Sequence, residues 1–247
     1  MRFPIVHTEL SIFLSSYSTP LVPWVGKSPS KWLSNVGSLM AYHVSVPAMA
    51  PSRKILYSLW SSNAPTEVCA LVTLAWGGMR ASHGRTLMAH MTHWIKTCDD
   101  LRNGKHTRRS AYDAFMQLRT AGLLPGMGPA YFTKLIHFAY PKAKGYILDQ
   151  WTARSVHTLT DQDSWPAVQV SAGSKSMNPA ALRIRVVDRV SGLDYEDYCV
   201  WVDGLATHLR ITGAELEERL FSSGGKAPHG WRKHLLTSWH VRHPKFY

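Results

Sequence analysis

The residues best suited to chemistry lie between Leu123 and Trp151, where a glycine-rich turn is followed by a single aspartate. The turn reads Leu124-Pro125-Gly126-Met127-Gly128, and Asp149 stands 21 residues after its last glycine. Two glycines separated by one residue let the backbone turn sharply without a Cβ clash. Since Pro129 favours the first position of a helix, we expect a helix to start directly after the turn. The unpaired amides and the dipole at such a helix start suit a phosphate oxygen.

Asp149 is predicted to stand at the start of its own helix. A carboxylate in that position accepts hydrogen bonds from two backbone N–H groups and remains ionised. Beside a sugar ring, such an anion stabilises an oxocarbenium-like transition state and orients or deprotonates the attacking water. A turn that holds a nucleic-acid backbone without reading bases therefore fits a carboxylate that cleaves an N-glycosidic bond. Taken singly, each feature also fits a plain helix corner or an N-cap that contributes about 1 kcal/mol.

The elements that must position these residues are predicted to be helices. Of the 247 residues 45% are apolar and 18% are charged, which is typical of a folded globular chain. Little strand alternation is present outside Leu182–Val190, so the sequence predicts a mainly α fold. Residues 1–53 are expected to hold irregular structure with short helices, and the C-terminus a basic aromatic tail. Apolar spacing and helix start and stop signals predict helices over about 63–76, 85–98, 110–121, 129–140, 150–159, 195–209 and 214–221.

The turn together with Asp149 resembles the helix-hairpin-helix (HhH-GPD) DNA glycosylase superfamily, and is most similar to 8-oxoguanine DNA glycosylase-like bacterial proteins. The strongest match spans about Ser110 to Leu159, and a fainter one spans Ala64 to Cys98. The resemblance implies a two-lobed helix-hairpin-helix glycosylase fold with a cleft between the lobes. One lobe would span 62–148 and contain the helix-hairpin-helix at about 110–140. The other would combine 1–61 with 149–247, with the catalytic aspartate at the junction.

The resemblance also implies an activity, the flipping and excision of a modified base from double-stranded DNA by hydrolysis. Asp149 would be the catalytic carboxylate, and the residues from Pro125 to Gly128, together with Ala130, would bind DNA. Relatives that also cut the strand carry a lysine at the position of Ala130. Its absence predicts a monofunctional enzyme that leaves an abasic site. Lys134, one turn further on, is expected to contact phosphate or to be a surface lysine, and a substitute nucleophile is the remaining alternative.

The sequence is compatible with alternatives for the substrate, for the biological role and for the functional class. The substrate is either an oxidised purine or a bulky modified base, such as hydroxymethylated or glucosylated cytosine in phage DNA. The role is accordingly either DNA repair or antiviral defence. A non-catalytic helix-hairpin-helix DNA-binding protein is the alternative from another functional class.

Further candidate residues surround this pair of features. Lys142 and Lys144 lie between the turn and Asp149 and are candidates for contacts to DNA phosphates. Met79 and Arg80 follow the Gly77-Gly78 turn, at the place where relatives insert a wedge into the space left by a flipped base. The base pocket or wedge set is completed by two aromatic residues that either stack on a base or pack in the core, Trp76 and Trp151.

Charge and cysteine content limit the partners and the compartment. The formal net charge of +12 favours a polyanion, for which we expect nucleic acid rather than a membrane surface. Three cysteines without a CxxC pair predict no disulfide scaffold and no iron–sulfur cluster. The pair of His90 and His93 has Cys98 nearby but lacks a firm third metal ligand. We therefore expect no metal and no cofactor. The sequence shows neither a signal peptide nor a membrane span, so we expect the protein in the bacterial cytoplasm or nucleoid. We also expect it to be a monomer.

Overall fold

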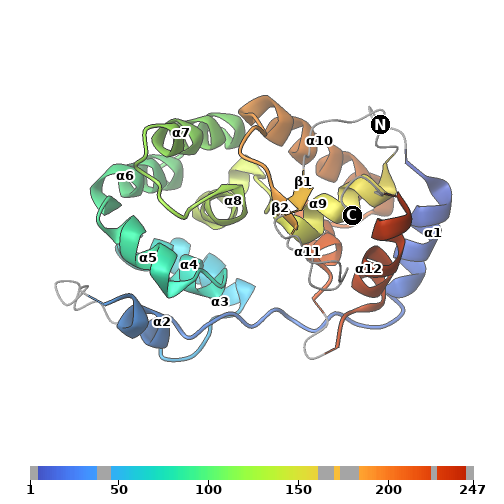
Figure 1. Ribbon diagram of the computed structural model, residues 1–247, viewed down its shortest axis with the longest axis horizontal. Coiled ribbons are helices and arrows are strands. Elements are labelled where there is room, and N and C mark those ends of the chain that lie inside the picture. The colour runs from blue at the N-terminus through green and yellow to red at the C-terminus, as the bar shows by residue number, and fades with distance from the viewer. Residues whose placement is uncertain (1–4, 38–45, 161–169, 173–183, 224–226, 243–247) are drawn as a thin grey trace. The chain divides into compact units, whose positions relative to one another are not determined.

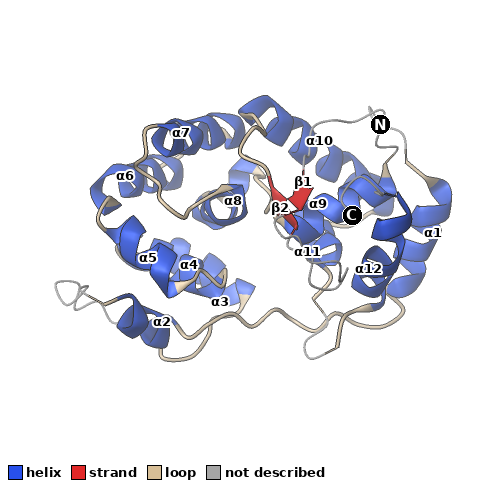
Figure 2. Cartoon of the chain, viewed as in Figure 1, coloured by secondary structure: helices blue, strands red, loops and turns tan. Residues whose placement is uncertain are grey.

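The computed structural model of the chain describes residues 5–37, 46–160, 170–172, 184–223 and 227–242. These residues form twelve α-helices, one 3-10 turn and one two-stranded antiparallel sheet (Figure 2). The predicted mainly α fold is therefore confirmed. The chain divides into two compact units: unit 1 holds Met1–Trp24 and Leu148–Tyr247, and unit 2 holds Val25–Ile147. The cleft stays a prediction.

Unit 2 is built around α8, the helix that follows the glycine-rich turn. Its helices are α2 (Pro29–Val36), α3 (Arg53–Trp60), α4 (Thr66–Trp76), α5 (Ala81–Met88), α6 (Met91–Arg102), α7 (Arg108–Thr120) and α8 (Pro129–Ala139), followed by the 3-10 turn η1 (Pro141–Ala143). Helix α8 packs against α3, α4, α6 and α7 (Figure 1). Phe132 of α8 stacks on Phe115 and meets Tyr112 edge-on, at centroid distances of 5.4 and 4.9 Å. This aromatic core fixes the helix that carries the turn.

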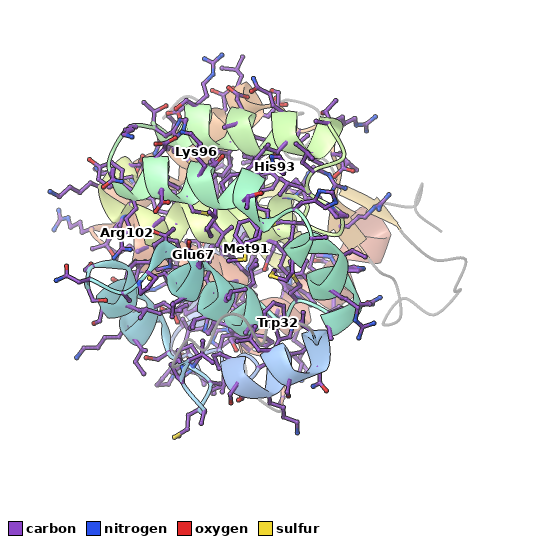
Figure 3. The ribbon with its side chains drawn as sticks, turned by 90° about the vertical axis from the view of Figure 1, so that its left-hand side faces the viewer. Trp32, Glu67, Met91, His93, Lys96 and Arg102 are labelled. Carbon is purple, nitrogen blue, oxygen red and sulfur yellow. The ribbon has the colours of Figure 1, made fainter. Side chains whose placement is uncertain are left out.

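Residues 25–36 belong to unit 2, and the division into lobes at residue 62 stays a prediction. Trp32 of α2 is buried, and its Nε1 donates to the carbonyl of Met79 at 2.8 Å. A Cβ on Gly84 of α5 would lie 2.7 Å from the Trp32 ring, so the two helices meet closely (Figure 3). Burial of this tryptophan against α5 places the segment in unit 2.

Unit 1 surrounds α9, the helix that begins after Asp149. Its elements are α1 (His7–Ser16), α9 (Gln150–Leu159), β1 (Val170–Ala172), β2 (Ile184–Val186), α10 (Gly192–Leu209), α11 (Gly213–Phe221) and α12 (Gly230–Arg242). Helix α9 packs against α1, α11 and α12, and α11 packs against α10. Strand β2 lies within the segment predicted to be extended, of which residues 182 and 183 fall outside the described residues. The segments at both ends of the chain thus cover the helix that follows the aspartate.

Several helix boundaries differ from the sequence prediction. The helix expected over 85–98 is two helices, because His90 leaves the helical region of backbone conformation with φ −113° and ψ 16°. Helix α7 begins at Arg108 because Thr107, not Ser110, caps it, and the Ser110 side chain completes that capping box. The expected C-terminal tail contains helix α12, and α3 was not predicted. Within the described part of the chain, no helix is long and apolar enough to cross a membrane.

Candidate functional site

The glycine-rich turn has the backbone geometry that its sequence predicts. Gly126 has a φ of +74°, in the left-handed region that favours glycine. The amide of Met127 donates to the carbonyl of Leu124 at 3.2 Å, and both of these side chains are buried. Arg119 of α7 donates from Nη1 to the Met127 carbonyl at 3.2 Å. The turn is therefore held by the burial of Leu124 and Met127 and by the hydrogen bond from Arg119.

Three backbone amides at this turn keep their donor capacity. The amides of Tyr131 and Phe132 both donate to the carbonyl of Gly128. By contrast, the amides of Gly126, Gly128 and Ala130 donate to no acceptor within the described part of the chain. Gly126 is exposed, and the other two residues are half-buried. Donors of this kind at the start of α8, together with its dipole, suit an anionic oxygen.

The turn also makes close contact with helix α5. A Cβ on Gly126 would lie 2.7 Å from Cβ of His83 and 2.9 Å from its Cγ. His83 is half-buried, and its Nδ1 is buried without a hydrogen-bond partner among the described residues. Glycine is thus required at position 126 both by the backbone conformation and by the neighbouring helix.

The lysines predicted to bind DNA lie in two different environments. Lys142 and Lys144 are exposed, and the carbonyl of Lys144 accepts a hydrogen bond from Arg108 Nη1 at 2.9 Å. Lys134 is only 6% exposed, and its Nζ donates back to the carbonyl of Ala130 at 2.5 Å. Its aliphatic stem passes Gly77, where an added Cβ would lie 2.8 Å from the lysine Cδ. The first two lysines can meet a phosphate directly, whereas the third packs within unit 2.

The proposed wedge residues also differ in exposure. Met79 is fully buried, whereas Arg80 is exposed and stands at the N-cap position of α5. Trp76 is buried edge-on against Phe138 of α8, and the Arg53 guanidinium lies 5.4 Å from its ring centroid. Of the three candidates Trp76, Met79 and Arg80, the arginine alone is exposed as the protein stands, and the wedge and stacking roles stay predictions.

A buried histidine that the sequence analysis did not single out fixes the chain between the turn and the aspartate. His137 of α8 receives a hydrogen bond from the Tyr57 hydroxyl at Nε2, at 2.6 Å, and its Nδ1 bonds the carbonyl of Gly145 at 2.8 Å. Burial lowers the pKa of His137 to about 3, and the charges of Arg53 and Lys134 add to this shift. The histidine is therefore neutral, with the proton on Nδ1.

Asp149 caps helix α9 in unit 1, as the sequence predicted. Its Oδ1 accepts from the amides of Trp151 and Thr152 at 2.8 and 3.3 Å. In return the Thr152 Oγ1 accepts from the Asp149 amide at 2.9 Å, which completes a capping box. The side chain of Tyr198 bonds Thr152, and burial raises the pKa of Tyr198 well above its usual range, so this phenol stays protonated. The carboxylate is thus held by backbone in a buried setting, with 8% of the residue exposed.

The ring of Trp151, two residues after the aspartate, has two guanidinium groups over it. Arg154 lies 4.8 Å from the ring centroid, and Arg232 of α12 lies 4.2 Å from it. A planar cation over an indole gains cation–π attraction and excludes other groups from the position it occupies. The predicted stacking of Trp151 on a base stays untested. Across the part of the chain that is described, no cluster of three or more His, Cys, Asp or Glu residues suits a metal ion.

Comparison with known protein families gives one match that covers most of the chain. The model of the family described as "Putative 8-oxoguanine DNA glycosylase OGG-like protein" matches residues 29–221. The chain belongs to this OGG-like family. No curated protein and no solved structure matches it.

Membership in the OGG-like family identifies the chain as a DNA glycosylase-like protein and implies that it binds DNA. The matched region includes the glycine-rich turn and Asp149. It leaves out α1 and α12, which lie on either side of it in the sequence and pack on α9. The resemblance seen in the sequence is thereby confirmed, and its extent reaches beyond the segments on which it was based.

The contact between the turn and α5 makes a testable prediction for the OGG-like chain. Gly126→Ala should lower the free energy of unfolding by more than the roughly 1–2 kcal/mol that a left-handed backbone costs an L-residue, because its Cβ also meets His83. Gly122→Ala is the matched control, since Gly122 has a φ of +76° and an added Cβ there meets nothing within 4 Å. Denaturant unfolding measures both variants, and equal losses would contradict the close contact.

The neutral His137 predicts a particular dependence of stability on pH. In the unfolded chain this residue binds a proton near the ordinary histidine pKa of 6.5, whereas in the folded chain it does so only near 3. The contribution of His137 to stability is therefore complete above pH 6.5 and is lost as the pH falls towards 3.

The measurement is the stability difference between the wild type and His137→Gln, obtained by unfolding at several pH values. The difference should shrink as the pH falls from about 7 to about 4.5, because only the wild type loses this contribution. His93→Gln, which removes an exposed histidine of α6, is measured over the same pH values as the control for the substitution itself. A constant difference for His137→Gln would refute the assignment of a neutral buried imidazole.

Proposed function

We propose that the chain excises a modified base from double-stranded DNA by hydrolysing its N-glycosidic bond, and that it leaves an abasic site. The observation that carries the proposal is the buried Asp149 carboxylate, bonded by two amides at the start of α9. Membership in the OGG-like family supports the same reaction class. The chain is proposed to act as a monomer.

Asp149 is the catalytic residue in this proposal. As the bond to the base breaks, positive charge develops on the sugar, and a fixed carboxylate stabilises it. The same group orients the water that attacks the anomeric carbon and accepts its proton, while the electron pair of the broken bond leaves with the base. The hydrogen bonds from the amides of Trp151 and Thr152 hold one carboxylate oxygen in place, so the site needs little reorganisation during the reaction.

The turn from Pro125 to Gly128 binds the DNA backbone in this proposal. The amides of Gly126, Gly128 and Ala130 would donate to phosphate oxygens, and the buried Met127 supports the turn from within. Exposed Lys142 and Lys144 supply further phosphate contacts that carry no sequence preference. The net charge of +12 predicts that binding weakens steeply with salt.

The target base is flipped out of the duplex, and the substrate we propose is an oxidised purine. The description of the family supports this choice over a bulky modified cytosine. Arg80, exposed at the start of α5, is proposed to enter the gap in the stack. Met79 and Trp76, the other two candidates in this part of the chain, are buried as the protein stands.

Replacement of Asp149 by asparagine tests the mechanism most cleanly. Asparagine is an equally good N-cap, so Asp149→Asn should keep the fold and the DNA affinity, while excision falls by at least about 100-fold. Excision is measured as alkali-labile sites on a duplex that carries 8-oxoguanine, and binding is measured on the same duplex. Undiminished excision by the variant would exclude Asp149 as the catalytic carboxylate.

The proposed reaction is monofunctional, because position 130 holds alanine and Lys134 is engaged with its carbonyl. Borohydride should therefore trap no covalent complex between the chain and abasic DNA, since no imine forms. A glycosylase with lyase activity serves as the positive control. A trapped complex that is lost in Lys134→Gln would contradict the monofunctional assignment.

A further inference from the structure

Helix α12 brings an arginine from outside the family match to the helix that Asp149 caps. The match ends at residue 221, whereas Arg232 lies in the first turn of α12. Its guanidinium carbon lies 4.2 Å from the ring centroid of Trp151, two residues after Asp149. Nothing in the sequence pattern singled out this arginine, because the segment was expected to be a tail.

The position of α12 on α9 is fixed by contacts on several sides. Trp231 is fully buried, and its Nε1 donates to Ser155 Oγ of α9 at 2.8 Å. Phe13 of α1 meets the Trp231 ring edge-on at 5.0 Å. One turn further on, His234 Nε2 pairs with the buried Glu9 carboxylate of α1 at 2.7 Å. These contacts lie on both sides of Arg232 in the sequence, so the backbone position of Arg232 is set before any substrate binds.

The guanidinium of Arg232 is held between aromatic groups but keeps hydrogen-bonding capacity. It lies over the rings of Trp151 and Phe221, at 4.2 and 4.7 Å from their centroids. One of its nitrogens, Nη2, donates to the carbonyl of Phe221. Its Nε is buried and has no acceptor within the described residues. A guanidinium carries five N–H donors, so this arrangement orients the group without using up its donors.

Arg232 lies beside a second guanidinium near the N-terminal end of α9, which Asp149 caps. Burial lowers the pKa of Arg232, and the negative charge of Asp149 acts in the opposite direction. A second guanidinium, that of Arg154, lies over the same tryptophan ring. Positive charge therefore collects at the N-terminal end of α9, where the helix dipole is also positive and Asp149 is the capping anion.

We propose that Arg232 binds a phosphodiester of the substrate strand beside the nucleotide that is excised. This assignment rests on the function proposed above. The planar fork of a guanidinium matches two phosphate oxygens, and the aromatic rings keep the fork in one orientation. Trp151 then supports Arg232 rather than stacking on the flipped base. DNA affinity in this chain therefore depends on a helix that the family match does not include.

The test measures DNA binding in the Asp149→Asn background, so that turnover does not interfere. The probe is a duplex with a tetrahydrofuran abasic-site analogue, which makes the result independent of the base. Arg232→Gln should weaken binding and reduce the slope of log affinity against log salt by about 1, as expected for one lost phosphate contact. Arg232→Lys should keep the slope but bind more weakly than wild type, since it keeps the charge and loses the fork.

Lys233→Gln is the matched control, because it removes one exposed charge from the next position of the same helix. It should leave the slope unchanged. Thermal unfolding establishes that each variant is folded, and Arg232→Lys carries the test if Arg232→Gln unfolds. Equal slopes and affinities for Arg232→Gln and Lys233→Gln, or wild-type affinity for Arg232→Lys, would overturn the proposal. Failure of the proposed function would appear differently, as a wild type that makes no abasic sites.

Discussion

The capping of α9 by Asp149 is the interaction on which the rest of the structure depends. A single carboxylate oxygen accepts hydrogen bonds from two backbone amides, so the group that caps the helix is also the group proposed to perform the chemistry. Such a bond stabilises the helix and directs the carboxylate at the same time. The surrounding elements of unit 1 serve this arrangement, since α1, α11 and α12 all pack on α9. The position of the carboxylate is therefore as rigid as the helix behind it.

In unit 2, a buried helix presents backbone N–H donors at its N-terminus. Helix α8 is surrounded by four other helices, and its aromatic residues fill the core. The turn before it is anchored by the buried Leu124 and Met127, while three of its amides have no acceptor in the described part of the chain. At the other end of α8, His137 ties the chain that leads towards Asp149 to Tyr57 of α3. The burial of α8 thus fixes the glycine-rich turn before the helix and the chain that follows it.

Features that depend on local chain chemistry were predictable from the sequence. Gly126 adopts the left-handed backbone expected of a tight turn, and Asp149 caps its helix as a short polar residue before a helical pattern should. Features that depend on distant partners were not. The bond between Tyr57 and His137 joins residues 80 apart, and the pair of Glu9 with His234 joins residues 225 apart. The spacing of Trp231 and Leu235, both buried, was the one local sign that the C-terminus forms a helix.

The central claim is that this chain removes a base and does not merely bind DNA. The most direct measurement is a panel of duplexes that carry 8-oxoguanine, hydroxymethylcytosine, glucosylated hydroxymethylcytosine or only ordinary bases, incubated with the protein and then treated with alkali. The proposed function predicts strand breaks at the position of 8-oxoguanine and none in the unmodified duplex. Breaks at a modified cytosine alone would keep the reaction and change the substrate. Salt-sensitive binding to every duplex, without alkali-labile sites in any of them, would contradict the claim.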